Sequence, residues 1–325
     1  MSNERIFTMG REDVARVLVL EEVVDVVRDA YIAMANGSAR LFPLVREPVG
    51  AAMFGLRSAV WEDRELLGLK VSGYFPENAA EGRDNHQATI VLVSPRTGRP
   101  SAFIDGNHVT WIRTAAAGAL GTSLLARADA RRVLVVGNGL QAEAQAVGHA
   151  EVLADRTPEI LVHAPRDADG SKATAFVERL AARGLAVRAA PDVERALSEA
   201  DVVVTATLAR EPIVRSEWIA SGTHITAIGS DAPGKRELDP RLVDRARLVV
   251  DSADQSRRFG ESQDLADVAA VEIGAILTGR ATGRTSAEEI TIFDSTGIGL
   301  HDLVTAELAR RKGVELGAGA WLSLA

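Results

Sequence analysis

Three basic residues stand inside or beside apolar, strand-like stretches of the sequence: Arg46, Lys70 and Arg113. An unpaired charge is costly in such a stretch, so each of these cations needs an anionic partner. Lys70 is the clearest case, because Leu66-Leu67-Gly68-Leu69 precedes it in the pattern of a buried strand. If the three cations converge, they form a receptor for a carboxylate, with arginine supplying a two-pronged contact. The alternative is that each is separately salt-bridged or extends its charged end to solvent.

A second candidate for chemistry is Asp231, in the segment Gly229-Ser230-Asp231-Ala232-Pro233-Gly234-Lys235. This segment follows an expected strand, and ligands of parallel sheets bind at the carboxyl ends of the strands. Asp231 could therefore act as an acid or base, or hold a substrate nitrogen. Capping of a turn is an equally good interpretation of the same aspartate.

The segment 131–142 combines an apolar strand, a tight glycine turn and the start of a helix. Gly137 permits the turn, and Gly139 lets backbone amides approach a pyrophosphate at the helix N-terminus. Ala142 takes the position where a small residue lets helix and strand pack closely. Within a strand–helix–strand unit, this pattern predicts dinucleotide binding rather than a purely structural turn.

The end of the next strand indicates which dinucleotide binds. The segment His163-Ala164-Pro165-Arg166-Asp167 has no acidic residue at the strand's end, where NAD-binding folds place one for the ribose. Arg166 could instead pair with a 2′-phosphate. The sequence therefore gives NADP(H) a slight preference over NAD(H), with a solvated surface arginine as the alternative.

The elements that must position these residues fall into two groups. Amphipathic spacing predicts a helix over 11–36, and short apolar runs predict strands at 66–74, 89–93 and 101–104, followed by a helix over 110–126. From residue 132, buried strands alternate with helices, which is typical of a parallel sheet covered on both faces. We therefore expect an α/β fold, with a Rossmann-type parallel-sheet domain after an α+β domain. A last helix is expected across 300–311.

Composition excludes several classes of function. The chain has 325 residues, no cysteine, and 37 basic against 45 acidic residues, for a net charge of −8. Thiolate metal sites, iron–sulfur clusters and cysteine nucleophiles are excluded, and the six histidines show no ligand spacing, so we expect no metal. The negative charge disfavours nucleic acid and membrane surfaces as partners. We see no signal-peptide pattern, and no apolar run of about 18 residues, so we expect a cytoplasmic protein.

Six separated blocks resemble the ornithine cyclodeaminase/μ-crystallin family over nearly the whole chain. They are Leu69-Lys70, His86-Gln87-Ala88-Thr89, Gly106-Asn107 with 110–116, the glycine turn 137–142, the segment 229–235 and Phe293-Asp294-Ser295-Thr296-Gly297. The resemblance implies interconversion of amino acids with imino or keto acids, with NAD(H) or NADP(H) as cofactor. It also implies a homodimer, with residues 1–118 and 298–325 as the substrate-binding and dimerisation domain and 119–297 as the Rossmann domain.

The resemblance also assigns site residues. Arg46, Lys70 and Arg113 match the group that binds the substrate carboxylate, and Asp231 matches the acidic residue that acts on the reacting amine. We expect Lys70 and Asp231 to be catalytic, with a depressed pKa at Lys70 because two arginines flank it. The residues expected to contact the cofactor are Thr114, Gly137, Gly139, Leu140, Gln141, Arg166, Thr205, Ala206, Thr207, Gly229, Ser230, Ser295, Thr296 and Gly297.

One departure bears on the substrate. Ornithine cyclodeaminases use a carboxylate in the strand ahead of the lysine to hold the distal ammonium of ornithine, and this chain has Arg57 at or beside that place. A cation there would repel ornithine and attract a second carboxylate. Together with Asn85-His86-Gln87 and 73–78, this resembles the iminosuccinate reductase branch, so we expect reduction of an imino-dicarboxylate with Arg57 and Asn85 as substrate contacts.

Other functions stay open. Within catalysis, they are ornithine cyclodeamination, alanine dehydrogenation and ketimine reduction, with Arg57 pointing to solvent. From another class, a crystallin-like protein could bind the dinucleotide without catalysing a reaction. The presence of both Lys70 and Asp231 argues against that class, because a pure binder needs no acid or base.

Overall fold

The computed structural model describes residues 5–265 and 267–323, and the chain divides into two compact units. Unit 1 comprises Met1–Arg113 with Ile298–Ala325, and unit 2 comprises Thr114–Gly297. The expected boundary after residue 118 and this one after Arg113 both fall within helix α3 (Gly106–Leu125). Among the described residues, no helix is both long and apolar enough to cross a membrane.

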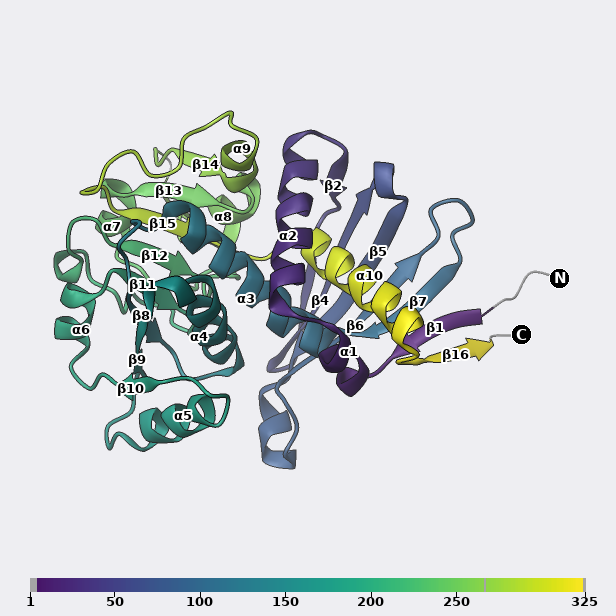
Figure 1. Ribbon diagram of the computed structural model, residues 1–325, viewed down its shortest axis with the longest axis horizontal. Helices are drawn as coiled ribbons and strands as arrows, with labels where there is room; N and C mark the ends of the chain where they lie inside the picture. Colours follow the sequence, from purple (N-terminus) through teal and green to yellow (C-terminus); the bar gives the residue numbers. More distant parts are fainter. Residues whose placement is uncertain (1–4, 266, 324–325) are drawn as a thin grey trace. The chain divides into compact units, whose positions relative to one another are not determined.

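Unit 1 contains a mixed sheet in the order β16-β1-β7-β6-β5-β4-β2, with β3 also pairing with β4 (Figure 1). The β1–β7 pair is parallel, and the other pairs of this sheet are antiparallel. Its strands are β1 (Arg5–Met9), β2 (Ala39–Leu41), β3 (Val45–Val49), β4 (Ala52–Trp61), β5 (Leu66–Tyr74), β6 (His86–Val93), β7 (Pro100–Asp105) and β16 (Ala320–Ser323).

In the described part of unit 1, helix α10 (Gly299–Leu316) packs against α1 (Arg11–Val17) and α2 (Leu20–Ala35), and the first residues of α3 also belong to this unit. The single helix predicted over 11–36 is wrong, because the backbone is extended at Leu18 and Val19, and this separates α1 from α2. Helix α10 contacts α2 and also β4 and β5 of the sheet, across which it lies in Figure 1.

Two glycines let α10 approach the sheet closely. A Cβ atom on Gly68 of β5 would lie 3.0 Å from the side chain of Leu303, and one on Gly299 would lie 3.0 Å from the backbone nitrogen of Ser58. A side chain at either position would force its neighbours on α10 or the sheet to shift. The close packing matters because α10 and β5 both carry charged residues of the candidate site.

Unit 2 contains a parallel sheet in the order β10-β9-β8-β11-β12-β15-β13-β14. Its first five strands follow the Rossmann order 3-2-1-4-5. The strands are β8 (Arg132–Val136), β9 (Glu159–His163), β10 (Val187–Ala189), β11 (Val202–Thr205), β12 (His224–Ala227), β13 (Arg247–Val250), β14 (Ala270–Glu272) and β15 (Thr291–Asp294). The predicted α/β class with a Rossmann-type parallel sheet is confirmed.

The α-helices that follow α3 in unit 2 are α4 (Leu140–Val152), α5 (Ser171–Ala181), α6 (Val193–Glu199), α7 (Pro240–Arg245), α8 (Ala253–Phe259) and α9 (Ile273–Leu277). Short 3₁₀ helices occur in both units: η1 (Glu62–Arg64), η2 (Pro76–Glu81), η3 (Ala154–Arg156) and η4 (Ser216–Trp218). Two apolar clusters flank the sheet, one containing Val133 and Val135 of β8 and the other Leu134 and Val136. This alternation explains why β8 reads as a continuous apolar run.

Candidate functional site

Lys70 lies in the buried part of unit 1. Its Nζ atom donates hydrogen bonds to Oδ1 of Asp302 at 2.8 Å and to Oγ1 of Thr110 at 3.0 Å. The side chain of Lys70 is 2% exposed and that of Asp302 is 0% exposed. The sequence prediction that Lys70 needs an anionic partner is thus met by a carboxylate from α10.

Arg113 shares the same acceptor. Its Nε atom donates to Oδ1 of Asp302 at 3.0 Å, which leaves the two Nη groups of the guanidinium to other partners. One internal carboxylate therefore holds Lys70 and Arg113 side by side. Sequence reasoning missed Asp302. The signal was available, because Asp302 stands between Leu300 and Leu303 in an apolar stretch of helix, as Lys70 does in its strand.

Register places two further arginines on the face of the sheet that carries Lys70. Arg57 of β4 is directly opposite Lys70, and Arg46 of β3 is directly opposite Gly55, two residues before Arg57. Directly opposed residues of antiparallel strands point to the same face, as do residues i and i+2. Arg46, Arg57 and Lys70 are therefore on one face, and Arg57 and Arg46 are half-buried.

The electrostatics of this group follow from burial and from its excess of cations. Burial lowers the pKa of Lys70 to about 7, the charge of Asp302 opposes this, and the charges of Arg113 and Arg57 add to it. Burial alone would raise the pKa of Asp302, but the charges of Lys70 and Arg113 outweigh it and lower that pKa to about 2. Asp302 is thus an anion at any working pH, while Lys70 exchanges its proton near neutrality.

Asn85 immediately precedes β6, and His86 is the first residue of that strand. The Oδ1 of Asn85 accepts a hydrogen bond from the backbone of Ala79 at 2.9 Å, and its Nδ2 donates to the hydroxyl of Tyr74 at 3.3 Å. Burial and the charges of Lys70 and Arg113 lower the pKa of His86 to about 4. A neutral imidazole, which the sequence prediction did not include, therefore belongs to the electrostatic surroundings of Lys70.

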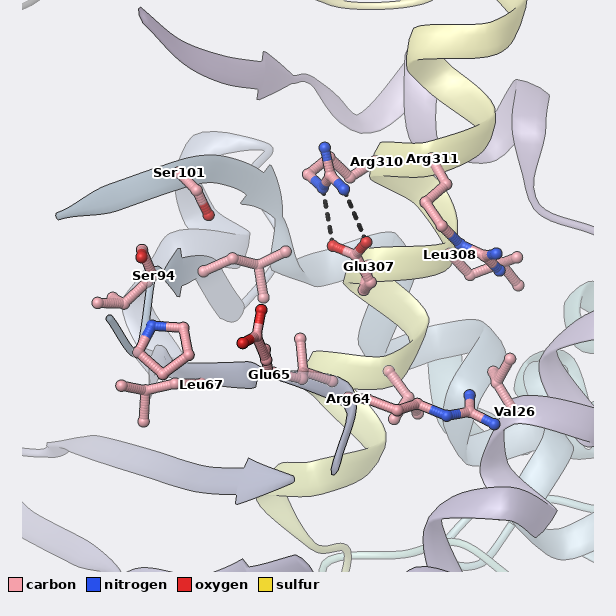
Figure 2. Close-up of a pocket in the computed structure, with 15 residues that line it drawn as sticks. Val26, Arg64, Glu65, Leu67, Ser94, Ser101, Glu307, Leu308, Arg310 and Arg311 are labelled. Carbon is pink, nitrogen blue, oxygen red and sulfur yellow. Dashed lines mark hydrogen bonds and ion pairs between the residues drawn. The ribbon is translucent and has the colours of Figure 1, made fainter. Parts of the chain in front are cut away.

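A hollow of about 740 Å³ opens elsewhere in unit 1, between α10, the start of β5 and the end of β6. Its lining includes Leu67, Leu92, Leu308 and Arg311, and Figure 2 shows Glu307 and Arg310 of α10 paired at its side. None of the residues predicted for catalysis, substrate or cofactor lines it. The hollow is therefore separate from the cation group.

In unit 2, the glycine turn has the geometry of a dinucleotide site. Gly137 has φ +136°, and a Cβ atom there would lie 2.6 Å from the carbonyl oxygen of Ala206. Gly139 is the N-cap of α4, and a Cβ atom there would meet nothing within 4 Å. The free backbone amides of the first turn of α4 thus adjoin open space, which fits a pyrophosphate.

Several predicted cofactor residues of unit 2 lie at strand ends or in loops and are hydrogen-bonded to buried carboxylates. Glu237 accepts hydrogen bonds from Thr205 Oγ1, the backbone of Thr207 and the backbone of Gly229. Asp251 accepts hydrogen bonds from Ser295 Oγ at 3.2 Å, Thr296 Oγ1 at 2.9 Å and the backbone of Gly297 at 2.6 Å. Sequence reasoning missed both acids, which tie together loops that lie far apart in the sequence.

Predicted residues around these loops are placed as follows. Thr114 is buried, and its carbonyl oxygen accepts a hydrogen bond from Gln145. The backbone N–H of Ala206 donates to the carbonyl oxygen of Val136. Ser230 Oγ donates to the carbonyl oxygen of Lys235. Leu140 is exposed, as is Leu208, an apolar residue that the sequence prediction did not include. Exposed leucines here would give a bound ring system apolar contacts.

The loop after β9 leaves Arg166 exposed, with φ +62°. Asp167 caps α5, because its carboxylate accepts hydrogen bonds from the backbone of Lys172 and Ala173. Asp167 is thus committed to the helix rather than to a ribose. Among residues 5–265 and 267–323, no group of three or more His, Asp or Glu side chains has an arrangement that could hold a metal ion.

Asp231 lies in the loop after β12. Its Oδ1 accepts a hydrogen bond from Nζ of Lys235 at 2.6 Å, and its side chain is 35% exposed. A partly exposed, ion-paired carboxylate at the carboxyl end of a parallel strand is accessible to a ligand.

Comparison with known proteins gives consistent matches. The chain is 36% identical to the iminosuccinate reductase of Paracoccus denitrificans over 321 residues, 95% of this chain and 98% of that protein. A crystal structure of that reductase with NAD⁺ has a TM-score of 0.89 at 34% identity and covers 98% of this chain and 100% of its own.

Two further solved structures are similar over the whole chain. The Thermococcus litoralis Δ¹-pyrroline-2-carboxylate reductase, in complex with NADH and L-proline, has a TM-score of 0.90 at 31% identity, covering 97% of this chain and 99% of its own. An archaeal alanine dehydrogenase dimer with bound NAD has a TM-score of 0.90 at 32% identity, and the match covers 99% of this chain and 100% of its own.

These relatives are enzymes, which confirms the prediction of an enzyme over that of a protein that only binds the dinucleotide. The resemblance seen in the six sequence blocks is also confirmed. The profile of one family matches residues 6–315. The chain belongs to the ornithine cyclodeaminase/mu-crystallin family.

Proposed function

We propose that this protein reduces an α-imino dicarboxylic acid to the amino acid with NADH, and that iminosuccinate, which gives aspartate, is the best fit. The observation that carries the proposal is the charge of the group around Lys70. Lys70 and Arg113 donate hydrogen bonds to the one carboxylate of Asp302, and the charge of a third cation, Arg57, also acts on it. The surplus positive charge in a desolvated place favours a ligand with two carboxylates.

The substrate carboxylates would divide this group between them. The Nη groups of Arg113 and the ammonium of Lys70, with Arg46 on the same face, would hold the α-carboxylate. Arg57, directly opposite Lys70 in the sheet, would hold the distal carboxylate. Fixing both ends of a short substrate leaves its C=N carbon in one place, which lowers the entropic cost of the reaction.

Unit 2 would hold the dinucleotide. The turn at Gly137 and Gly139, the first turn of α4 and the loops organised by Glu237 and Asp251 fit its pyrophosphate and nicotinamide ends. When bound, NADH supplies the hydride for the C=N carbon. We favour NAD(H) because the three similar structures named above contain NAD⁺, NADH or NAD, and because Arg166 points from an exposed turn.

The sequence of the loop at Arg166 predicted a slight preference for NADP(H), and a comparison of NADH with NADPH tests this against the NAD(H) that we favour. NADH should support a higher kcat/KM than NADPH in the wild type, and Arg166→Ala should change neither value by more than about twofold. A higher kcat/KM with NADPH that is lost in Arg166→Ala would instead assign the arginine to a 2′-phosphate.

Two groups would handle the proton. As electron density rises on the substrate nitrogen, a nearby acid must protonate it or hold the protonated iminium. Lys70, with a pKa of about 7, can donate a proton near neutrality. Asp231 would bind the N–H groups of the nitrogen, in keeping with the role the family resemblance implies. Loss of turnover with retained cofactor binding is expected for Lys70→Ala and Asp231→Ala.

We further propose a homodimer formed through unit 1, in which a second copy covers the hollow of Figure 2. The lining of the hollow includes the apolar side chains of Leu67, Leu92 and Leu308, and a similar alanine dehydrogenase is a dimer. Leu67→Glu should lower the solution mass from dimer to monomer by light scattering. An unchanged dimer in this variant would place the interface elsewhere.

The proposed reaction is tested by following NADH consumption with oxaloacetate plus ammonium, pyruvate plus ammonium, and Δ¹-pyrroline-2-carboxylate, and NAD⁺-dependent release of ammonia from ornithine. The expected result is the highest kcat/KM with oxaloacetate plus ammonium, with L-aspartate as product. Preference for pyruvate, the cyclic imine or ornithine would assign the corresponding alternative in the family. No turnover with any of them would contradict an imine reductase.

A further inference from the structure

Lys235 forms a second lysine–carboxylate pair, in the loop between β12 and α7. Its Nζ atom donates hydrogen bonds to Oδ1 of Asp231 at 2.6 Å and to the carbonyl oxygen of Gly229 at 3.3 Å. The lysine side chain is 17% exposed and the aspartate side chain 35% exposed. The pair is thus partly buried, and the aspartate side chain is the more exposed of the two.

The backbone around Lys235 is fixed by several hydrogen bonds. Its carbonyl oxygen accepts from Ser230 Oγ at 2.8 Å and from Gln263 Nε2 at 2.5 Å. The backbone N–H of Gly234, at φ +74°, donates to Gln263 Oε1 at 2.8 Å. A lysine on such an anchored loop loses less freedom when it pairs than a lysine on a mobile loop does. The ammonium is thus held at a defined place beside Asp231.

The neighbouring charged residues of the loop, Arg236 and Glu237, bind other groups of the protein. Arg236 donates to the carbonyl oxygen of Gln263 and pairs with Asp264 at 3.6 Å. Glu237 accepts the three hydrogen bonds that organise the neighbouring loops. Lys235 is therefore the cation of this loop that is directed to Asp231. Only four of the 37 basic residues of the chain are lysines. Lys235 is one of them, and it is paired with Asp231, a residue predicted to be catalytic.

We propose that Lys235 is a positioning residue that keeps Asp231 ionised and oriented to bind the substrate nitrogen. The inference rests on the proposed function, in which Asp231 contacts that nitrogen. In the oxidative direction, one proton passes from the substrate ammonium to the neutral amine of Lys70, giving a neutral substrate amine and a lysine ammonium, while the Asp231 carboxylate accepts hydrogen bonds from the substrate N–H groups. In the reductive direction, the anionic carboxylate holds the iminium N–H groups. Both require an anion at Asp231, which the adjacent ammonium stabilises.

The test compares Lys235→Met, Lys235→Arg and, as a matched control, Lys172→Met. Lys172 is an exposed lysine of the same unit. Lys235→Met should lower kcat about 10- to 100-fold, as expected for impaired acid–base catalysis. It should leave the NADH dissociation constant and the melting temperature near their wild-type values. Lys235→Arg should recover most of the kcat, and Lys172→Met should match the wild type.

Each other outcome overturns the proposal in a distinguishable way. A wild-type kcat in Lys235→Met excludes the positioning role. Equal losses of NADH affinity and melting temperature in Lys235→Met and Lys235→Arg assign the lysine to folding of the loop alone. Absence of turnover in the wild type with every imino acid contradicts the proposed function itself, and this inference with it.

Discussion

The Nζ atom of Lys70 lies 2.8 Å from Oδ1 of Asp302, with both side chains buried. The two residues come from β5 and α10 and are 232 positions apart in the sequence. Removing one partner of a buried pair typically costs about 3–5 kcal/mol, because the other charge is left uncompensated. The pair therefore joins α10 to the sheet and holds the ammonium in the place that we propose for the substrate carboxylate.

The first prediction concerns Asp302→Asn. Lys70 and Arg113 would then repel each other without a shared anion, and the pKa of Lys70 would fall below about 7, because Asp302 opposes its lowering. A proton donor must be protonated, so activity of the wild type should decline as the pH rises through about 7. In Asp302→Asn this decline should move to lower pH.

At neutral pH, kcat/KM of Asp302→Asn should fall about 100-fold or more, as expected for loss of a proton donor. The pH dependence of kcat/KM is the measurement. Asp63→Asn, an exposed acid in η1 of the same unit, is the matched control. The interpretation would be wrong if Asp302→Asn kept the wild-type pH profile.

Sequence reasoning identified the cations but not their partner. Lys70 and Arg113 could be predicted because a charge inside an apolar run is conspicuous within a few residues. Asp302 could not be matched to them, because the pairing depends on how α10 packs on β5, and local pattern carries no such information. The same limit explains why Glu237 and Asp251 were missed, since each binds residues that follow another strand, and the sheet topology decides which strands are neighbours.

The local sequence pattern was sufficient to predict an element where its bounds depend on residues close together in the sequence. The strand Leu66–Tyr74 has the bounds predicted from its apolar run. The helix predicted over 11–36 was too long, because its apolar spacing continues through Leu18 and Val19 although the backbone there is extended. Periodicity alone cannot detect such a break without a glycine or proline.

The second prediction separates the two glycines of the turn. Gly137→Ala should destabilise unit 2, because φ is +136° and the new Cβ would lie 2.6 Å from the oxygen of Ala206. Gly139→Ala should leave the melting temperature near the wild-type value, because open space surrounds its Cβ position.

If a pyrophosphate occupies that space, Gly139→Ala should nevertheless weaken NADH binding by about tenfold, an effect of about 1.4 kcal/mol. Fluorescence titration with NADH and thermal unfolding of the same samples give the two readouts. Wild-type NADH affinity in Gly139→Ala would place the dinucleotide away from this turn.

The third prediction concerns His149, a buried histidine of α4. Its Nδ1 faces the carbonyl oxygen of Gln145 at 2.8 Å, so this nitrogen carries the hydrogen, and Nε2 accepts from Thr122 Oγ1 at 2.8 Å. Burial lowers the pKa of His149 from 6.5 to about 4, against the opposing effect of the Gln145 hydrogen bond. The folded protein therefore binds fewer protons here than the unfolded chain between pH 6.5 and about 4.

The contribution of His149 to the free energy of unfolding should thus fall as the pH drops from 6.5 to about 4, and level off below. The full change is about 3 kcal/mol from the size of the shift. Denaturant unfolding at several pH values should show a shallower acid loss in His149→Gln than in the wild type. Parallel curves for the two proteins would show that His149 does not titrate in this window.

The most direct test of the account compares two substrates in Arg57→Met and in Arg40→Met, a matched change of an exposed arginine on β2. The quantity measured is the ratio of kcat/KM for oxaloacetate plus ammonium to that for pyruvate plus ammonium, with NADH. Losing a charged hydrogen bond to the distal carboxylate should lower this ratio at least about tenfold in Arg57→Met. Arg40→Met should keep the wild-type ratio. An unchanged ratio in Arg57→Met would contradict recognition of a dicarboxylate by the cations around Lys70.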